Sequence, residues 1–361
     1  MRITCCTMGG VVDIVSGFEW KAILMQVKRN RQLWLLLTAA IIALAAAYCF
    51  WAPGKNVTDG RHNHLRNGIW LQHGWLGDDG WFTRTGRDRR LFRNAERIRG
   101  LAATLDAHHI IDVFPHLCPC LPEGWIAPVD DAQTELFLDN IGNRRVIPWV
   151  GGVLGKQVFL ESASWRANFA VSVRDLLSRH PRLAGIQINV EPLPSGNRDF
   201  LTLLDLVKHT LPKGKILSVA AYPPPTVWHP FPEIHWDRAY YGEVSRRCNQ
   251  LAVMMYDTAL ISSKLYQNLM AEWTQEVLQW AVGPSVLLGV PAYDDAGVGY
   301  DHPRVENLEN AILGVHAGLE RFAVIPSNYQ GIAVYCEWEM DASEWACLSA
   351  CFVRGKAGEG H

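Results

Sequence analysis

The chain has 361 residues, of which 49% are hydrophobic and 19% charged, so it is long enough for one large domain or two ordinary ones. Its formal net charge of -2 offers no attraction to a polyanion, which argues against nucleic acid as a partner. The 15 Trp residues are an unusual number, and Trp rings are common platforms for sugar rings, although most fill protein cores.

The first predicted element is the uncharged apolar run Leu33–Trp51, whose length is typical of a helix that spans a bilayer. Because the residues before it include a cluster of Lys and Arg, the positive-inside rule places residues 1–32 in the cytoplasm, with Met25 as an alternative start. We therefore expect a transmembrane or signal-anchor segment over residues 33–53, a linker over 54–65, and an exported remainder on the extracytoplasmic side. The three consecutive alanines at Ala45–Ala47 leave a cleaved signal peptide as the alternative to a membrane anchor.

After the linker, short β-branched or aromatic runs alternate with amphipathic stretches, a pattern typical of repeated βα units. The strands are expected at Gly68–Gln72, Ile110–Phe114, Val146–Val150, Gly185–Val190, Ile216–Ala221, Leu251–Tyr256, Val286–Val290 and Gly331–Tyr335. The helices are expected at Arg90–Ala107, Asp131–Ile141, Trp165–Arg179, Phe200–Thr210, Tyr240–Arg247, Leu265–Ala281 and Val305–Arg321. Eight strands with intervening helices predict the α/β fold class, as a (β/α)8 TIM barrel over residues 66–355.

Functional side chains of such barrels gather at the carboxyl ends of the strands. Here those ends carry aromatic rings alternating with carboxylates, which suits a glycoside, because sugars need stacking surfaces and an acid for the leaving oxygen. The candidate substrate-binding residues are Trp70, Gln72, Trp75, Trp149, Gln187, Tyr222, Tyr293, Tyr335, Glu337 and Trp338.

The stretch "AGIQINVEP" places polar side chains at every second position of a buried strand. With a period of two, Gln187, Asn189 and Glu191 point to one face, which in a barrel of this size is the packed interior. A carboxyl group at the end of such a strand loses part of its hydration, and its pKa is expected to rise. Glu191 is therefore the candidate general acid for a glycosidic oxygen.

The same stretch resembles strand four of the glycoside hydrolase family 18 barrels, the chitinases and their relatives, whose pattern is D-G-x-D-x-D-x-E. This chain keeps Gly185 and Glu191 of that pattern and has Asn189 where the family has its last Asp. Further similarities lie in order along residues 66–345, at "IPWVGG", "VMMYD", "LLGVPAYD" and "GIAVY", where Tyr335 replaces the usual Trp.

The resemblance implies a hydrolase of β-linked N-acetylglucosamine glycans that needs no cofactor and works by substrate assistance. The acetamido oxygen of the substrate attacks the anomeric carbon, while Glu191 acts as the acid and then the base. By resemblance, Tyr256 hydrogen-bonds the acetamido carbonyl and Asp257 supports the acid or the sugar. Asn189 brings no negative charge to a cationic intermediate, and in this respect the chain is similar to the family 85 endo-β-N-acetylglucosaminidases, which use an Asn-x-Glu pair.

Two alternatives remain open from the sequence. The loss of acidic positions around Glu191 also fits a barrel that binds glycan with weak or no catalysis. A two-carboxylate retaining glycosidase would pair Glu191 with Glu337 or Glu339. No metal is expected, because the "CPC" at Cys118–Cys120 matches no standard zinc spacing and suits a disulfide or free thiols better.

Overall fold

The structure is a computed structural model that describes residues 17–294 and 301–354. The chain forms two compact units, residues 1–52 and residues 53–361. In the first unit, α1 (Gly17–Phe50) is a single helix, and its segment Arg31–Phe50 has a mean hydropathy of 2.3 and is long and apolar enough to cross a membrane. The first 16 residues of the predicted cytoplasmic tail lie outside the described residues.

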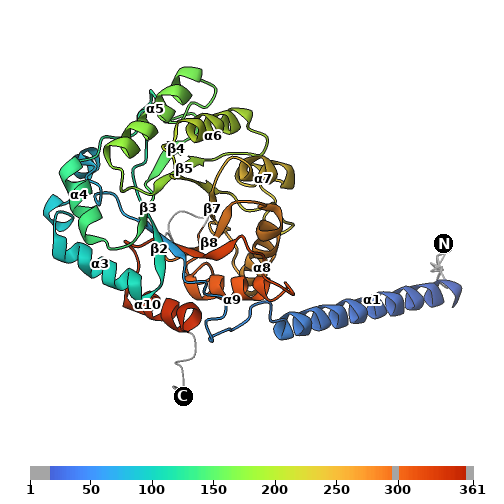
Figure 1. The fold of residues 1–361 in the computed structure, drawn as a ribbon. Coiled ribbons are helices and arrows are strands. Elements are labelled where there is room, and N and C mark those ends of the chain that lie inside the picture. The colour runs from blue at the N-terminus through green and yellow to red at the C-terminus, as the bar shows by residue number, and fades with distance from the viewer. Residues whose placement is uncertain (1–16, 295–300, 355–361) are drawn as a thin grey trace, which may run out of the picture. The chain divides into compact units, whose positions relative to one another are not determined.

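The second unit is a (β/α)8 barrel, as predicted. Figure 1 shows its strands arranged in a ring with the helices on the outside. The strands are β1 (Asn67–Leu71), β2 (Ile110–Pro115), β3 (Arg145–Val146), β4 (Trp149–Val153), β5 (Gly185–Glu191), β6 (Ile216–Ala221), β7 (Gln250–Val253), β8 (Ser285–Pro291) and β9 (Tyr329–Tyr335). All neighbouring pairs are parallel, in the order β3-β2-β1-β9-β8-β7-β6-β5-β4.

The ring closes through the third barrel position, where β3 and β4 are two halves of one strand. The sequence predicts a continuous strand there, but Pro148 has no backbone N–H to donate, and the ladder is interrupted beside it. The first half pairs with β2 and the second half with β5. A bridge from His116 to Trp149 and the hydrogen bond from Leu117 N to Trp149 O (2.8 Å) join the two sides.

The helices around the ring begin where a short polar side chain caps them. Asn94 starts α3 and Asn307 starts α9, which is why these helices begin later than the apolar pattern predicted. The helices are α2 (Asp79–Thr85), α3 (Ala95–Ala107), α4 (Asp131–Asn140), α5 (Ala163–Arg179), α6 (Arg198–Thr210), α7 (Arg238–Ser245), α8 (Ser263–Trp280), α9 (Leu308–Leu319) and α10 (Ala342–Leu348). The short helices α2 and α10 were not predicted.

Two hydrophobic clusters hold the barrel. The larger one lies between strands and helices, whereas the smaller one includes Trp70, Phe114 and Leu287, side chains from three strands. β8 and β9 present alternate side chains to these two clusters, whereas β5 contributes Ile186 and Ile188 to the larger one and no side chain to the smaller one. The remaining face of β5 is therefore available for the polar residues of the candidate site.

Candidate active site

The centre of the candidate site is the carboxyl end of β5. Gln187 and Asn189 are buried on its inward face, and Glu191 follows at the last position, partly exposed. The Asn189 amide donates a hydrogen bond from Nδ2 to Oε1 of Glu191 at 2.5 Å. Burial raises the pKa of Glu191, and the Asn189 hydrogen bond offsets part of that rise. The strand thus presents a carboxyl group that keeps its proton to a higher pH than an exposed Glu.

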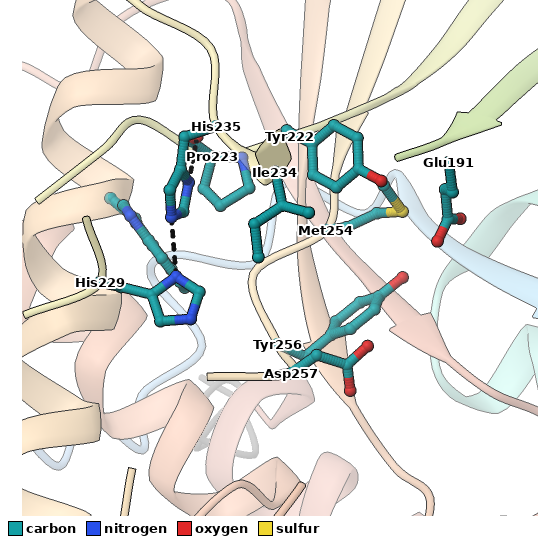
Figure 2. Close-up of a pocket in the computed structure, with 10 residues that line it drawn as sticks. Glu191, Tyr222, Pro223, His229, Ile234, His235, Met254, Tyr256 and Asp257 are labelled. Carbon is teal, nitrogen blue, oxygen red and sulfur yellow. Dashed lines mark hydrogen bonds between the residues drawn. The ribbon is translucent and has the colours of Figure 1, made fainter. Parts of the chain in front are cut away.

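Beside Glu191 lies a partly enclosed cavity of about 100 Å³. Figure 2 shows the hydroxyl groups of Tyr222 and Tyr256 directed toward Glu191 from the ends of two other strand positions. The cavity is smaller than the few hundred Å³ of a typical ligand pocket, so it suits a substituent rather than a whole sugar ring. Its lining residues are Glu191, Tyr222, Pro223, His229, Ile234, His235, Met254, Tyr256, Asp257 and Trp273.

The segment after β7 carries Tyr256 and Asp257. The predicted strand Leu251–Tyr256 ends earlier, at Val253, and Asp257 has a left-handed backbone with φ of 61°. The Tyr293 hydroxyl donates a hydrogen bond to Oδ1 of Asp257, and the Tyr256 ring stacks on Tyr335 with centroids 5.2 Å apart. Burial raises the pKa of Tyr256 well above its ordinary value, so its hydroxyl stays a hydrogen-bond donor.

Further aromatic rings surround Tyr335 at the same end of the barrel. Trp149 meets it edge to face at 6.1 Å, and Trp338 does so at 5.6 Å. Trp149 is nearly buried and Trp338 is half-buried. The structure therefore brings the predicted rings of Trp149, Tyr256, Tyr293, Tyr335 and Trp338 together in one cluster of contacting pairs.

Trp70 also meets Tyr335 edge to face, at 5.8 Å, whereas Gln72, Trp75, Gln187 and Glu337 make other contacts. Trp70 Nε1 donates to Gln187 Oε1 at 2.8 Å, and Gln187 Nε2 donates to Ser218 at 3.1 Å, so these groups already bond to one another inside the barrel. Trp75 is 2% exposed and packs against Phe92 and Phe137 in the larger core cluster. The backbone N–H of Gln72 donates to Glu337 at 3.4 Å.

Glu337 is held on the β1 side of the barrel rather than at the cavity. Besides the Gln72 bond, its own backbone N–H donates to Trp70 O at 3.0 Å. Burial raises the pKa of the Glu337 carboxyl group. Glu337 does not line the cavity beside Glu191.

Glu306 holds the segment after β7 through a hydrogen bond to its backbone. Its Oε2 accepts a hydrogen bond from Thr258 N at 2.8 Å. Burial, with smaller contributions from the charges of Asp301 and Asp257, raises the pKa of Glu306 to about 7 from its ordinary value of 4.5. In the unfolded chain this carboxyl group loses its proton near pH 4.5, whereas in the folded protein it keeps the proton to about pH 7.

We expect Glu306→Gln to make stability less dependent on pH. Because the folded state binds the proton more tightly, the wild-type free energy of unfolding falls as pH rises from about 4.5 to 7, by up to about 3 kcal/mol. A glutamine keeps an acceptor for Thr258 N and does not ionise, so the variant loses this fall. Urea unfolding of both proteins between pH 5 and 8 measures the difference. Glu309→Gln, which removes an exposed carboxylate from the first turn of α9 just after Glu306, is the control, and equal slopes for wild type and Glu306→Gln would contradict the expectation.

Two cavity residues, His229 and His235, were not selected from the sequence. They come from the segment "YPPPTVWHPFPEIHW" between β6 and α7. Its position directly after a strand end, together with its aromatic content, was the available signal. Across the described part of the chain, no group of three or more His, Cys, Asp or Glu side chains is arranged to hold a metal ion.

No family model matches the sequence, and a search of curated proteins finds no match. Solved structures do match. The spore cortex-lytic enzyme SleL of Bacillus cereus is 13% identical with a TM-score of 0.51, over 81% of this chain and 76% of that chain. A glycoside hydrolase family 18 chitinase from Pseudoalteromonas aurantia is 14% identical with a TM-score of 0.50, over 78% of this chain and 97% of that chain.

The chain has a family 18-like chitinase fold. At these identities the likeness establishes the barrel and the order of its strands. In this family 18-like barrel, Glu191 ends β5, the strand in which the sequence resemblance placed the acid of the family. The "VMMYD" stretch begins at the last residue of β7.

Proposed function

We propose that the chain is a glycosidase acting on β-linked N-acetylglucosamine glycans, with Glu191 as general acid and base. The observation that carries the proposal is the meeting of Glu191 with the Tyr222 and Tyr256 hydroxyls at one cavity. An acid with a raised pKa and two phenol donors in a partly enclosed recess are the groups that cleavage of an N-acetylated glycoside needs. The likeness of the fold to chitinases and to a cortex-lytic enzyme supports the same substrate class.

In the proposed reaction, the protonated Glu191 carboxyl group gives its proton to the glycosidic oxygen as the bond to the anomeric carbon breaks. The acetamido oxygen of the substrate forms the new bond to that carbon, which avoids a protein nucleophile. The Tyr256 hydroxyl holds the acetamido group in place for this attack. The ionised Glu191 then removes a proton from the water that opens the cyclic intermediate, and the original configuration is retained.

Asn189 has a different role here from that of an aspartate. Its Nδ2 hydrogen bond stabilises the ionised form of Glu191 after proton transfer, because an N–H donor favours a carboxylate. It adds no negative charge to balance a cationic intermediate. We therefore propose that a cationic cyclic intermediate is stabilised less here than in a site that carries an aspartate at this position.

Two other functions stay open to test. The barrel would bind glycan without cleaving it if the uncharged Asn189 fails to support the intermediate. A two-carboxylate mechanism would need Glu337 or Glu339 beside Glu191, and the contact of Glu337 with the Gln72 backbone and its absence from the cavity lining favour substrate assistance instead.

The location of the barrel is also a proposal. The apolar segment within α1 and the Lys and Arg residues before it support export, with α1 as a membrane anchor or a signal peptide. The domain limits that we propose are 1–32 for the tail, 33–53 for the membrane segment, 54–65 for the linker and 66–355 for the barrel.

The test is product release from N-acetylglucosamine oligomers by the full chain, with a thiazoline analogue of the cyclic intermediate as inhibitor. We expect hydrolysis with retained configuration and competitive inhibition by the thiazoline, because both the analogue and the intermediate occupy the recess beside Tyr256. Hydrolysis insensitive to the thiazoline, with a covalent glycosyl group trapped on Glu337 or Glu339, would contradict substrate assistance. Binding of the oligomers without any hydrolysis would support the alternative in which the barrel binds glycan but does not cleave it.

A further inference from the structure

The end of the cavity opposite Glu191 is formed by a pair of histidines. His229 and His235 are 3% and 2% exposed, and both belong to the segment between β6 and α7. Nδ1 of His229 and Nε2 of His235 lie 2.7 Å apart, and Nδ1 of His235 lies 2.9 Å from the carbonyl oxygen of Pro223. The Glu191 end offers the phenol donors described above, so the two ends of the cavity differ in chemistry (Figure 2).

The hydrogen bonds fix which ring nitrogens carry protons. A backbone carbonyl only accepts, so Nδ1 of His235 carries the hydrogen in that bond, and Nε2 of a neutral His235 is the acceptor. His229 must then donate from its own Nδ1, which leaves Nε2 of a neutral His229 without a hydrogen. Burial lowers the pKa of His229 to about 4 and also lowers that of His235, so both rings are neutral near pH 7.

The hydrogen-free Nε2 of His229 is therefore the acceptor that the histidine pair presents to the cavity. His229 lines the cavity, and within residues 17–294 and 301–354 no protein group bonds to its Nε2. The ring cannot easily turn away, because Phe231 meets it edge to face at 4.8 Å and Trp273 does so at 5.9 Å. An acceptor that opens into the cavity and is held in one orientation takes a donor from whatever fills the cavity, water in the free protein and the substrate in the complex.

We propose that His229 is a specificity residue whose Nε2 accepts a hydrogen bond from an uncharged hydroxyl or amide N–H on the glycan substituent in the cavity. The inference rests on the proposed function and narrows its substrate class to neutral glycans at this position. A carboxylate there is disfavoured, because its oxygens only accept and would face the lone pair of Nε2 and the carboxyl groups of Glu191 and Asp257. An acidic ether substituent, such as that of muramic acid, is therefore disfavoured inside the cavity.

Binding measured by titration calorimetry tests this in the full chain carrying Glu191→Gln, in which turnover is expected to be strongly lowered. The probes are the N-acetylglucosamine hexamer and a peptidoglycan glycan fragment that contains muramic acid. We expect the hexamer to bind more tightly than the fragment. His229→Asn keeps a donor toward His235 and removes the cavity acceptor, and His229→Phe keeps the ring shape alone. Each should weaken hexamer binding by about threefold to tenfold and reduce the preference over the fragment.

His316→Asn is the matched control, since His316 is a buried histidine on α9 that packs on Phe352 and does not line the cavity. It should leave hexamer binding unchanged, and thermal unfolding checks that all variants are folded. Unchanged hexamer binding in a folded His229 variant overturns the inference while leaving the proposed function intact. If the Glu191→Gln chain with its native His229 binds both probes equally, the inference about His229 is overturned. This comparison does not depend on whether the His229 variants fold. Failure of every glycan to bind overturns the proposed function, and the inference with it.

Discussion

Glu191→Gln is expected to lower the rate of glycan hydrolysis by about 100-fold to 10,000-fold, the range that a positioned general acid contributes. Glutamine keeps the shape of the side chain and an oxygen that accepts from Asn189 Nδ2, so the hydrogen bond at the end of β5 survives. It has no proton of suitable acidity to give the glycosidic oxygen. Initial rates of product release from N-acetylglucosamine oligomers, with binding measured alongside, separate lost catalysis from lost affinity.

Glu96→Gln, which removes an exposed carboxylate from the first turn of α3, is the matched control and should hydrolyse as wild type. If Glu191→Gln retained most of the wild-type rate, the assignment of the acid would be wrong. A loss of the same size in Glu337→Gln or Glu339→Gln would instead favour a pair of carboxylates. Substrate assistance predicts a much smaller loss in these two variants, because Glu337 bonds the Gln72 backbone rather than facing the cavity.

Gly151→Ala is expected to prevent stable folding of the barrel. Gly151 lies in β4 with φ of 137°, a conformation that residues with a side chain rarely adopt. A Cβ atom at this position would lie 1.7 Å from the backbone oxygen of Asn189 in β5, so the two strands would have to separate. Because backbone rather than a flexible side chain is in the way, we expect a loss of at least about 4 kcal/mol in the free energy of unfolding.

Chemical unfolding followed by circular dichroism measures this loss. Gly100→Ala in α3 is the matched control, because an added Cβ there meets nothing within 4 Å and alanine is the better helix former. The control should be as stable as wild type or more so. A Gly151→Ala protein with wild-type stability would show that the backbone contact between β4 and β5 can relax.

Much of the fold could be predicted because the pattern that specifies it is local. The alternation of β-branched runs and amphipathic stretches predicted the strand positions to within a few residues, and the polar residues before the helices explain most of the shifts at the helix starts. The early end of β7 was missed, and so was the interruption at Pro148, although a proline within a predicted strand is a local signal for a break in the ladder.

The candidate site was predicted less completely. The period of two in β5 placed Gln187, Asn189 and Glu191 on one face, and the structure has them there. The same reasoning could not separate Trp149 and Tyr335, which contact each other in the ring cluster at the barrel mouth, from Trp75, which is buried against Phe92 and Phe137. An aromatic residue after a strand can turn toward the mouth or toward the outer core, and packing against distant residues decides between them.

The sequence by itself determined the order of the strands, the inward face of β5 and the single carboxyl group at its end, because side-chain alternation follows from backbone geometry. Only the tertiary structure decided that Trp70 Nε1 bonds Gln187 Oε1 across 117 positions of sequence, and that His229 lies at the cavity with Glu191. These contacts join residues far apart in the chain. Their formation depends on closure of the ring and on the path of the segment after β6, which no local pattern specifies.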